Sequence, residues 1–158
     1  MEIRENKMRI GILGGGQLAM MMIQMSEKHN IDFIVVDPSD NPPASKYVQC
    51  IKSDYNDKGS LDLLITECDV VTIDFENVPS EALKYLENKV SVYPGSYAVE
   101  ICQDRLKEKN IFNEYNIPTT EFRTVNSISD LSLAIEILGN DSILKSRRMG
   151  YDGKNQIT

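Results

Sequence analysis

The sequence predicts an α/β fold built on a parallel sheet. Short apolar runs rich in β-branched residues alternate with stretches of helical periodicity as far as about residue 95. Strand–helix–strand units join parallel strands, whose two faces are then covered by helices. The strand ends at Gly14, Asp37 and Phe75 are expected to share the carboxyl edge of the sheet, where open α/β sheets bind ligands.

The elements of this first part follow in order. Five apolar runs predict strands, over residues 8–14, 31–37, 47–54, 69–76 and 90–94. Three periodic stretches predict helices, over residues 17–30, 57–68 and 78–88. A stripe of apolar side chains on the first helix is expected to pack into the core, through Leu18, Met21, Met22 and Met25. Ser60 is expected to cap the second helix, and proline to start the third.

The character of the chain changes after residue 95, where a second domain is expected to begin (residues 1–96 and 97–158). One long amphipathic helix is predicted over 96–116, a strand over 120–125, and a helix over 127–139 with a capping box at Ser127 and Asp130 and a stop at Gly139. A strand over 142–148 leads into a glycine-bearing hairpin. Because the chain stops inside that hairpin, we expect it to be the front part of a longer protein.

Composition narrows the class of protein. The net charge of −7 argues against a nucleic-acid binder, which needs a basic face. The cysteines Cys50, Cys68 and Cys102 are far apart, as in inert, half-buried thiols of a cytoplasmic protein. His29 is the only histidine, which excludes a histidine-rich zinc site. We expect neither a signal peptide nor a membrane span.

The glycine loop after the first strand carries the first candidate site. Gly14 to Ala19 satisfy the G-x-G-x-x-G/A fingerprint, and Asp37 ends the next strand where an acid could hold the ribose of a dinucleotide. Glycines and helix-start amides equally suit another phosphate. Pro38 directly follows Asp37, and nothing in the chain offers hydride chemistry, which disfavours an NAD-binding module.

Three further stretches carry polar groups in patterns typical of a site. "DFENVP" (74–79) places Glu76 at the end of a strand on the same sheet edge, where an acid could hold a sugar hydroxyl or an amine or simply be solvated. "QDRLKEKN" (103–110) by itself resembles a charged helix surface. "LKSRRMGYDGKNQ" (144–156) combines a strand lysine, Lys145, with a glycine loop, which fits either a triphosphate clamp or a hairpin with surface cations.

Together these stretches resemble 5-(carboxyamino)imidazole ribonucleotide synthetase, an ATP-grasp ligase family of purine biosynthesis. The resemblance covers almost the whole chain, through "GILGGGQL", "VVDP", "FENVP", "QDRLKEKNIF", "IPTTEF" and "LKSRRMGYDGKNQ". It implies a Rossmann-like pre-ATP-grasp domain that holds no dinucleotide, followed by the first part of an ATP-grasp domain. A sister ATP-grasp ligase of purine synthesis is the alternative within enzymes; Gln17 and "FENVP" argue against it.

The resemblance also implies site residues. Gly15, Gly16, Gln17, Leu18 and Glu76 would bind aminoimidazole ribonucleotide, with Glu76, Tyr151 and Asp152 in catalytic positions. ATP would contact two cations and the loop that follows, namely Arg105, Lys145, Gly150, Tyr151, Asp152, Gly153, Lys154, Asn155 and Gln156.

The implied reaction uses ATP, bicarbonate and Mg²⁺. Bicarbonate would be phosphorylated to carboxyphosphate, and the substrate amine would take up the carboxyl group, directly or through released carbon dioxide. The Mg²⁺ ligands are expected beyond residue 158, so this chain alone is expected to be inactive, and the whole protein a cytoplasmic homodimer that acts on small molecules. Three departures stand out: Ala19-Met20 replaces the usual Gly-Arg, and Met149 and Asn155 replace loop glycines. Asn155 is expected to keep the turn and Met149 to stiffen it.

Overall fold

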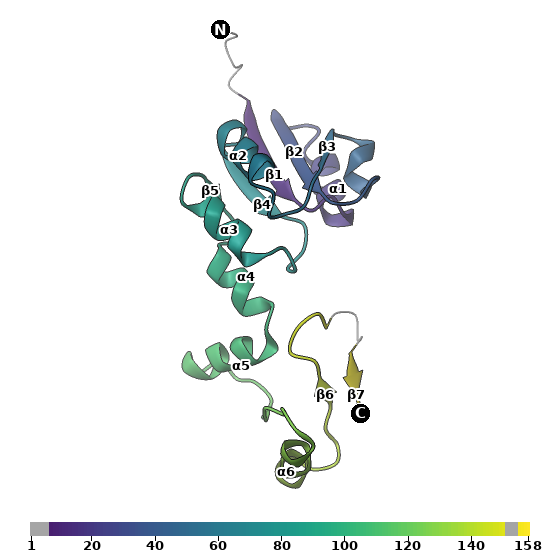
Figure 1. Ribbon diagram of the computed structural model, residues 1–158, viewed down its shortest axis with the longest axis vertical. Helices are drawn as coiled ribbons and strands as arrows, with labels where there is room; N and C mark the ends of the chain where they lie inside the picture. Colours follow the sequence, from purple (N-terminus) through teal and green to yellow (C-terminus); the bar gives the residue numbers. More distant parts are fainter. Residues whose placement is uncertain (1–6, 151–154) are drawn as a thin grey trace. The chain divides into compact units, whose positions relative to one another are not determined.

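The computed structural model describes residues 7–150 and 155–158 (Figure 1). The chain divides into two compact units, Met1–Val99 and Glu100–Thr158, and each is described by itself. The division falls three residues after the predicted boundary at residue 96.

A five-stranded sheet, parallel throughout, forms the first unit, as its alternating pattern predicts. β1 (Met8–Leu13) lies at the centre, between β2 (Ile31–Asp37) and β4 (Val70–Ile73). β3 (Cys50–Lys52) and β5 (Ser91–Val92) lie at the edges, in the order β3-β2-β1-β4-β5. The order in which strands are added to the sheet therefore reverses between β1 and β4. This reversal point is the place where open α/β sheets bind ligands.

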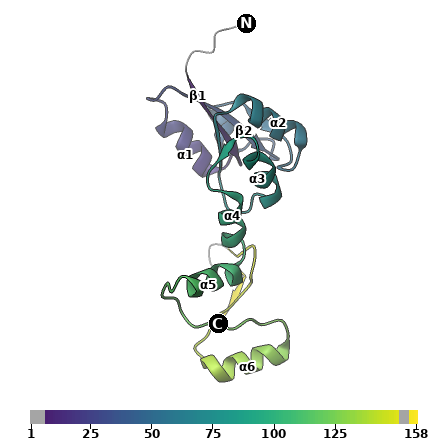
Figure 2. The ribbon, with the colours of Figure 1, turned by 90° about the vertical axis from the view of Figure 1, so that its left-hand side faces the viewer.

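Helices cover both faces of this sheet (Figure 2). α1 (Gln17–Met25) and the short 3-10 helix η1 (Pro43–Lys46) lie on one face. α2 (Lys58–Glu67) and α3 (Ser80–Glu87) lie on the other. Successive side chains of a strand point to opposite faces of the sheet, so neighbouring residues pack into different hydrophobic cores. Segment 43–46 is helical because a proline opens it.

The apolar stripe of α1 is not in the core, contrary to the prediction. Three of its four members are exposed, namely Leu18 (63%), Met21 (49%) and Met25 (79%). The helix instead buries Ala19 and Ile23, which lie four residues apart on one face. The small side chain of Ala19 lets the helix approach the sheet closely, so the adjacent face holds the methionines. The helix also ends at Met25 rather than at residue 30.

The cap of α2 differs from the prediction too. Asp57, rather than Ser60, precedes the helix, and its carboxylate accepts a hydrogen bond from the Ser60 amide at 2.9 Å. Asp and Ser both cap helices well, so residue type alone did not show which of the two caps α2.

The predicted long helix is two helices, α4 (Ser96–Cys102), within which the division between the units falls, and α5 (Arg105–Glu114) of the second unit. The break comes at Asp104, whose backbone is extended (φ −132°, ψ 105°) and whose carboxylate accepts from the Leu106 amide at 3.0 Å. A charged periodic run does not by itself reveal such an internal cap, because its apolar and charged spacing continues across Asp104 as it would on a helix surface.

The rest of the unit contains α6 (Ile128–Leu138) and a small antiparallel hairpin of β6 (Leu144–Lys145) and β7 (Gln156–Ile157). The caps of α6 are confirmed: Ser127 Oγ accepts from the Asp130 amide at 3.1 Å, and Gly139 ends the helix with φ 87°. Residues 120–125, predicted as a strand, form none, because no strand in the described part of the chain pairs with them.

Candidate functional site

The glycine loop lies at the carboxyl end of β1, as expected, but its glycines serve close packing within the protein. Gly14 has φ 100°, and a Cβ placed there would lie 2.7 Å from the Cβ of Asp74. A Cβ on Gly16 would lie 2.2 Å from Asp74 Oδ2, and one on Gly15 would lie 2.9 Å from the Cβ of Pro42. Glycine is therefore required here by the protein's own side chains, without any ligand.

Two carboxylates of the protein bind the amides of this loop. The amide of Gly15 donates to Asp37 Oδ2 at 2.7 Å. The amides of Gly16 and Ala19 donate to the two carboxylate oxygens of Asp74, at 2.8 and 2.6 Å. An anion is favourable at the start of a helix, and here Asp74 supplies it from the end of β4.

Asp37 is buried and fully engaged in the structure of the loop. Its carboxylate also accepts from the Ser39 amide at 2.8 Å and from the Tyr55 hydroxyl at 3.3 Å. Burial would raise the pKa of Asp37, but hydrogen bonds from the Gly15 amide, from Ser39 and from Tyr55 together outweigh it, and the pKa lies below its ordinary value. Burial and the charge of Asp37 in turn raise the pKa of the Tyr55 hydroxyl. The acid that a dinucleotide ribose would need is thus bound to backbone.

The stability of the first unit is expected to depend on the charge of Asp37. A carboxyl group whose pKa is lowered by folding stabilises the fold above its unfolded value, near 3.8, and this contribution is lost as the pH falls through the folded value. Asp37→Asn should cost about 1–3 kcal/mol at pH 7 and flatten the acid limb of the stability profile. Urea denaturation at pH 7 and pH 3 measures both effects. Asp40→Asn, at an exposed carboxylate nearby, is the control; parallel pH profiles for Asp37→Asn and the parent chain would contradict the assignment.

The exposed rim of this edge is formed by other residues. Gln17 and Leu18 open α1 with exposed side chains, whereas Gly15 is buried. Glu76 is exposed after β4, and its Oε1 accepts from Asn77 Nδ2 at 3.3 Å. The Asp74 amide donates to the Leu13 carbonyl at 3.0 Å, which joins the two strand ends that carry this rim. Gln17, Leu18 and Glu76 therefore lie at the same reversal point of the sheet.

A cavity of about 620 Å³ lies within the second unit, and both predicted ATP-binding cations, Arg105 and Lys145, line it. Lys145 lies in β6, as predicted, and is exposed. Five cationic side chains and two acidic ones line the cavity: Arg105, Lys109, Arg123, Lys145 and Arg147, with Glu121 and Asp141. Much of the remaining wall is apolar, including Phe122, Leu131, Ile135 and Ile143. Cationic side chains beside an apolar wall suit an anion that carries a flat ring.

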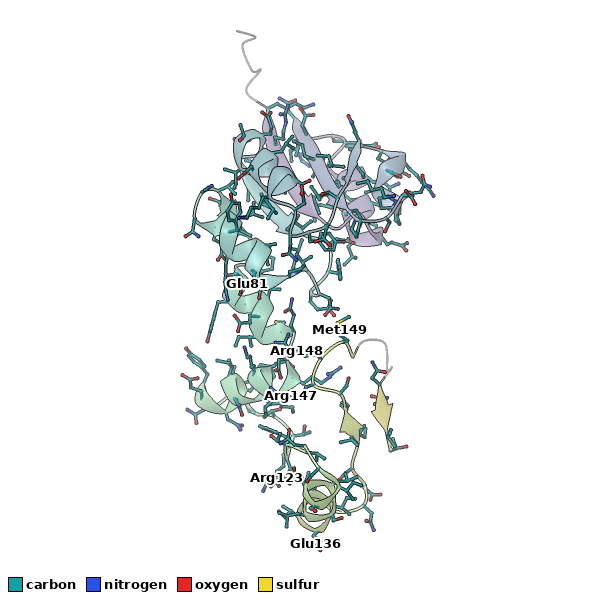
Figure 3. All side chains as sticks on the ribbon, in the orientation of Figure 1. Glu81, Arg123, Glu136, Arg147, Arg148 and Met149 are labelled. Atoms are coloured by element: carbon teal, nitrogen blue, oxygen red, sulfur yellow. The ribbon has the colours of Figure 1, made fainter. Side chains whose placement is uncertain are left out.

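Asp104, which no sequence pattern marked as a site residue, is a buried carboxylate that ties α5 to the segment after β6. Arg147 donates to it through Nε at 3.1 Å and Nη2 at 2.6 Å, so the ion pair is bidentate (Figure 3 labels Arg147). The hydrogen bonds from Arg147 lower the pKa of Asp104. Beside it, Arg105 donates from its amide to the Arg147 carbonyl at 2.9 Å and from Nη2 to the Gly150 carbonyl at 2.5 Å. In the sequence, this ion pair was indicated only by an acid within "QDR" and by arginines much further along the chain.

The loop after β6 has left-handed backbone at both departures from the family pattern. Met149 has φ 57° and Asn155 has φ 58°. Asn155 supports the turn through its side chain, which donates to the Met149 carbonyl at 3.1 Å, and its carbonyl accepts from the Ser146 amide at 3.0 Å. Methionine in this region costs about 1 kcal/mol relative to glycine. Tyr151, Asp152, Gly153 and Lys154, four of the predicted site residues, lie outside the described residues.

The described residues also bear on three other features: a metal site, the cysteine thiols and a membrane span. Among the residues described, no three His, Cys, Asp or Glu side chains gather as a metal site would need. Cys50 is partly buried, Cys68 is buried and Cys102 is exposed, so the expectation of half-buried thiols holds for the first alone. Over residues 7–150 and 155–158, every helix is too short or too polar to span a bilayer.

Fold and site together define an open α/β domain with an exposed polar rim at its reversal point, followed by a smaller unit with a cation-lined cavity. The family model for the ribonucleotide synthetase preATP-grasp domain matches residues 7–103. The chain belongs to this family.

N5-carboxyaminoimidazole ribonucleotide synthases are similar to this chain over nearly its whole length. An N5-carboxyaminoimidazole ribonucleotide synthase from Pseudomonas aeruginosa is 39% identical over 149 residues, which cover 94% of this chain and 41% of the relative. The structure of the Staphylococcus aureus synthetase complexed with ADP matches with a TM-score of 0.90 and 37% identity, over 98% of this chain and 42% of that one. The Aspergillus clavatus synthase in complex with ADP and 5-aminoimidazole ribonucleotide matches with a TM-score of 0.82 and 29% identity, over 96% and 40%. The chain thus spans about two fifths of the length of these relatives.

Proposed function

We propose that this chain supplies the ribonucleotide-binding domain and the first part of the ATP site of a ligase that carboxylates 5-aminoimidazole ribonucleotide. The observation that carries the proposal is the match to the Aspergillus clavatus synthase, whose complex holds both ADP and this ribonucleotide. The rim at the reversal point and the cation-lined cavity each suit one of these two ligands.

On the substrate side, Gln17, Leu18 and Glu76 are the proposed contacts. They are exposed and lie at one edge of the sheet, where a ligand can reach them. A carboxylate at Glu76 suits hydrogen bonds from ribose hydroxyls or from the amine that reacts. Tyr151 and Asp152 are proposed to act near the same amine.

On the nucleotide side, Arg105 and Lys145 are the proposed partners of the ATP phosphates, with the loop from Gly150 to Gln156. The two cations share the wall of one cavity, and the apolar part of that wall suits the base. Positive charge fixed near the phosphates stabilises the charge that spreads over the oxygens of the transferring phosphoryl group.

The proposed reaction has two steps. A bicarbonate oxygen attacks the γ-phosphorus of ATP, and carboxyphosphate and ADP are formed. The amine nitrogen of the ribonucleotide then attacks the carboxyl carbon, the bond to the phosphate oxygen breaks, and inorganic phosphate and a proton are released. The described residues of this chain do not gather a ligand set for Mg²⁺.

Turnover can be tested in a chimera that joins residues 1–158 to the remaining three fifths of the Staphylococcus aureus relative. We expect release of ADP that requires both bicarbonate and the ribonucleotide. Equal ADP release with NAD or ribose 5-phosphate in place of the ribonucleotide would contradict the proposed substrate. The isolated 158-residue chain is expected to release none.

Glu76→Gln should weaken binding of 5-aminoimidazole ribonucleotide by at least about tenfold, because one charged hydrogen-bond acceptor is lost. The side chain is exposed, so the free energy of unfolding should change by less than about 0.5 kcal/mol. Calorimetric titration and thermal denaturation measure the two quantities. Glu81→Gln, at an exposed acid on α3 that pairs with Lys84, is the matched control. A large loss of stability in Glu76→Gln would show a structural role instead.

A further inference from the structure

We propose that Asp74 determines what the glycine loop can bind, because its carboxylate occupies the place that a phosphate takes in a dinucleotide-binding loop. The amides of Gly16 and Ala19 already donate to its two oxygens, at 2.8 and 2.6 Å. The phosphate of the ribonucleotide must then lie outside these amides, a consequence that rests on the proposed function.

Electrostatics favours Asp74, rather than a phosphate, at the Gly16 and Ala19 amides. The start of a helix stabilises one anion, and Asp74 is covalently held at that point, so it competes at a very high effective concentration. A phosphate brought to the same amides would meet the charges of Asp74 and of Asp37, which binds the Gly15 amide at 2.7 Å. Like charges within a few ångströms repel strongly where water is partly excluded.

The same contacts explain why the loop looks like a dinucleotide fingerprint. Side chains of the protein itself fill the space in front of the glycines: a Cβ at Gly16 would lie 2.2 Å from Asp74 Oδ2. Asp37, the acid in the expected ribose position, points at backbone amides instead. The glycines therefore make room for internal acids, and the exposed Gln17 and Leu18 remain at the start of α1 for a substrate.

Amide resonances of the 158-residue chain test this proposal directly. Inorganic phosphate and NAD should leave the Gly15, Gly16 and Ala19 amides unshifted in the parent chain. In Asp74→Ser, phosphate should shift the Gly16 and Ala19 amides in a saturable way, at concentrations that leave the parent chain unshifted. Saturable shifts in the parent chain, or none in folded Asp74→Ser, would overturn the proposal.

Two further variants keep the test sharp. Asp74→Asn preserves the shape of the side chain and removes its charge, so it should gain a phosphate response weaker than that of Asp74→Ser. It serves as the test if Asp74→Ser does not fold. Asp69→Ser is the matched control, since Asp69 also binds a backbone amide, that of Arg9 at 2.7 Å, but at the opposite end of the sheet. It should gain no response.

The ribonucleotide itself separates this inference from the proposed function. If it shifts Gln17 and Leu18 but not Gly16 and Ala19, both hold. If it shifts Gly16 and Ala19 in the parent chain, Asp74 does not exclude phosphate and this inference is wrong, while the proposed substrate stands. If it shifts nothing while Asp74→Ser gains the phosphate response, the inference is supported and the proposed substrate site is wrong.

Discussion

Gly14→Ala is expected to lower the free energy of unfolding of the first unit by about 3–5 kcal/mol. Two costs add. The backbone there has φ 100°, which L side chains rarely adopt, and the new Cβ would lie 2.7 Å from the Cβ of Asp74. A Cβ–Cβ clash cannot be relieved by a rotamer change, so β1 and the end of β4 must move apart. Hydrogen exchange of the β1 amides reports this unit by itself.

A second glycine in the chain separates the two costs. Gly139 has φ 87°, but a Cβ there would meet no atom within 4 Å. Gly139→Ala should therefore cost only the backbone strain, about 1–3 kcal/mol. If Gly14→Ala costs no more than Gly139→Ala, the close approach of Asp74 to the loop is wrong.

Lys145→Ala should lower kcat/KM for ATP by at least about 100-fold in the chimera, because a cation placed on the transferring phosphates contributes roughly 3 kcal/mol to the transition state. The lysine is exposed on a two-stranded hairpin, so its loss should leave the fold intact. Steady-state release of ADP at several ATP concentrations measures the effect.

Lys107→Ala is the control for this experiment. Lys107 lies on α5 of the same unit and forms an ion pair with Glu100, but it is not among the residues that line the cavity. Its replacement should change kcat/KM by less than about twofold. An unchanged rate in Lys145→Ala would remove this lysine from the phosphate site.

Local patterns predicted most of the elements. The alternation of strands and helices was right, as were the caps of α6 and the strand position of Lys145, because each depends on residues within a few positions of one another. The error on α1 has a physical cause that lies outside the helix. Which face of α1 is buried depends on how near the helix comes to the sheet, and Ala19, rather than the larger methionines, sets that distance.

The sequence by itself determined the fold class, the edge of the sheet that holds the candidate rim, and the stretches by which the family is recognised. Only the tertiary structure decided what the glycine loop holds. Asp74 follows Gly16 by 58 residues, and Asp104 precedes Arg147 by 43. Such partners meet because parallel strands and a hairpin carry them to one place. Periodicity describes a single element and contains no information about which distant side chain will fill the space in front of it.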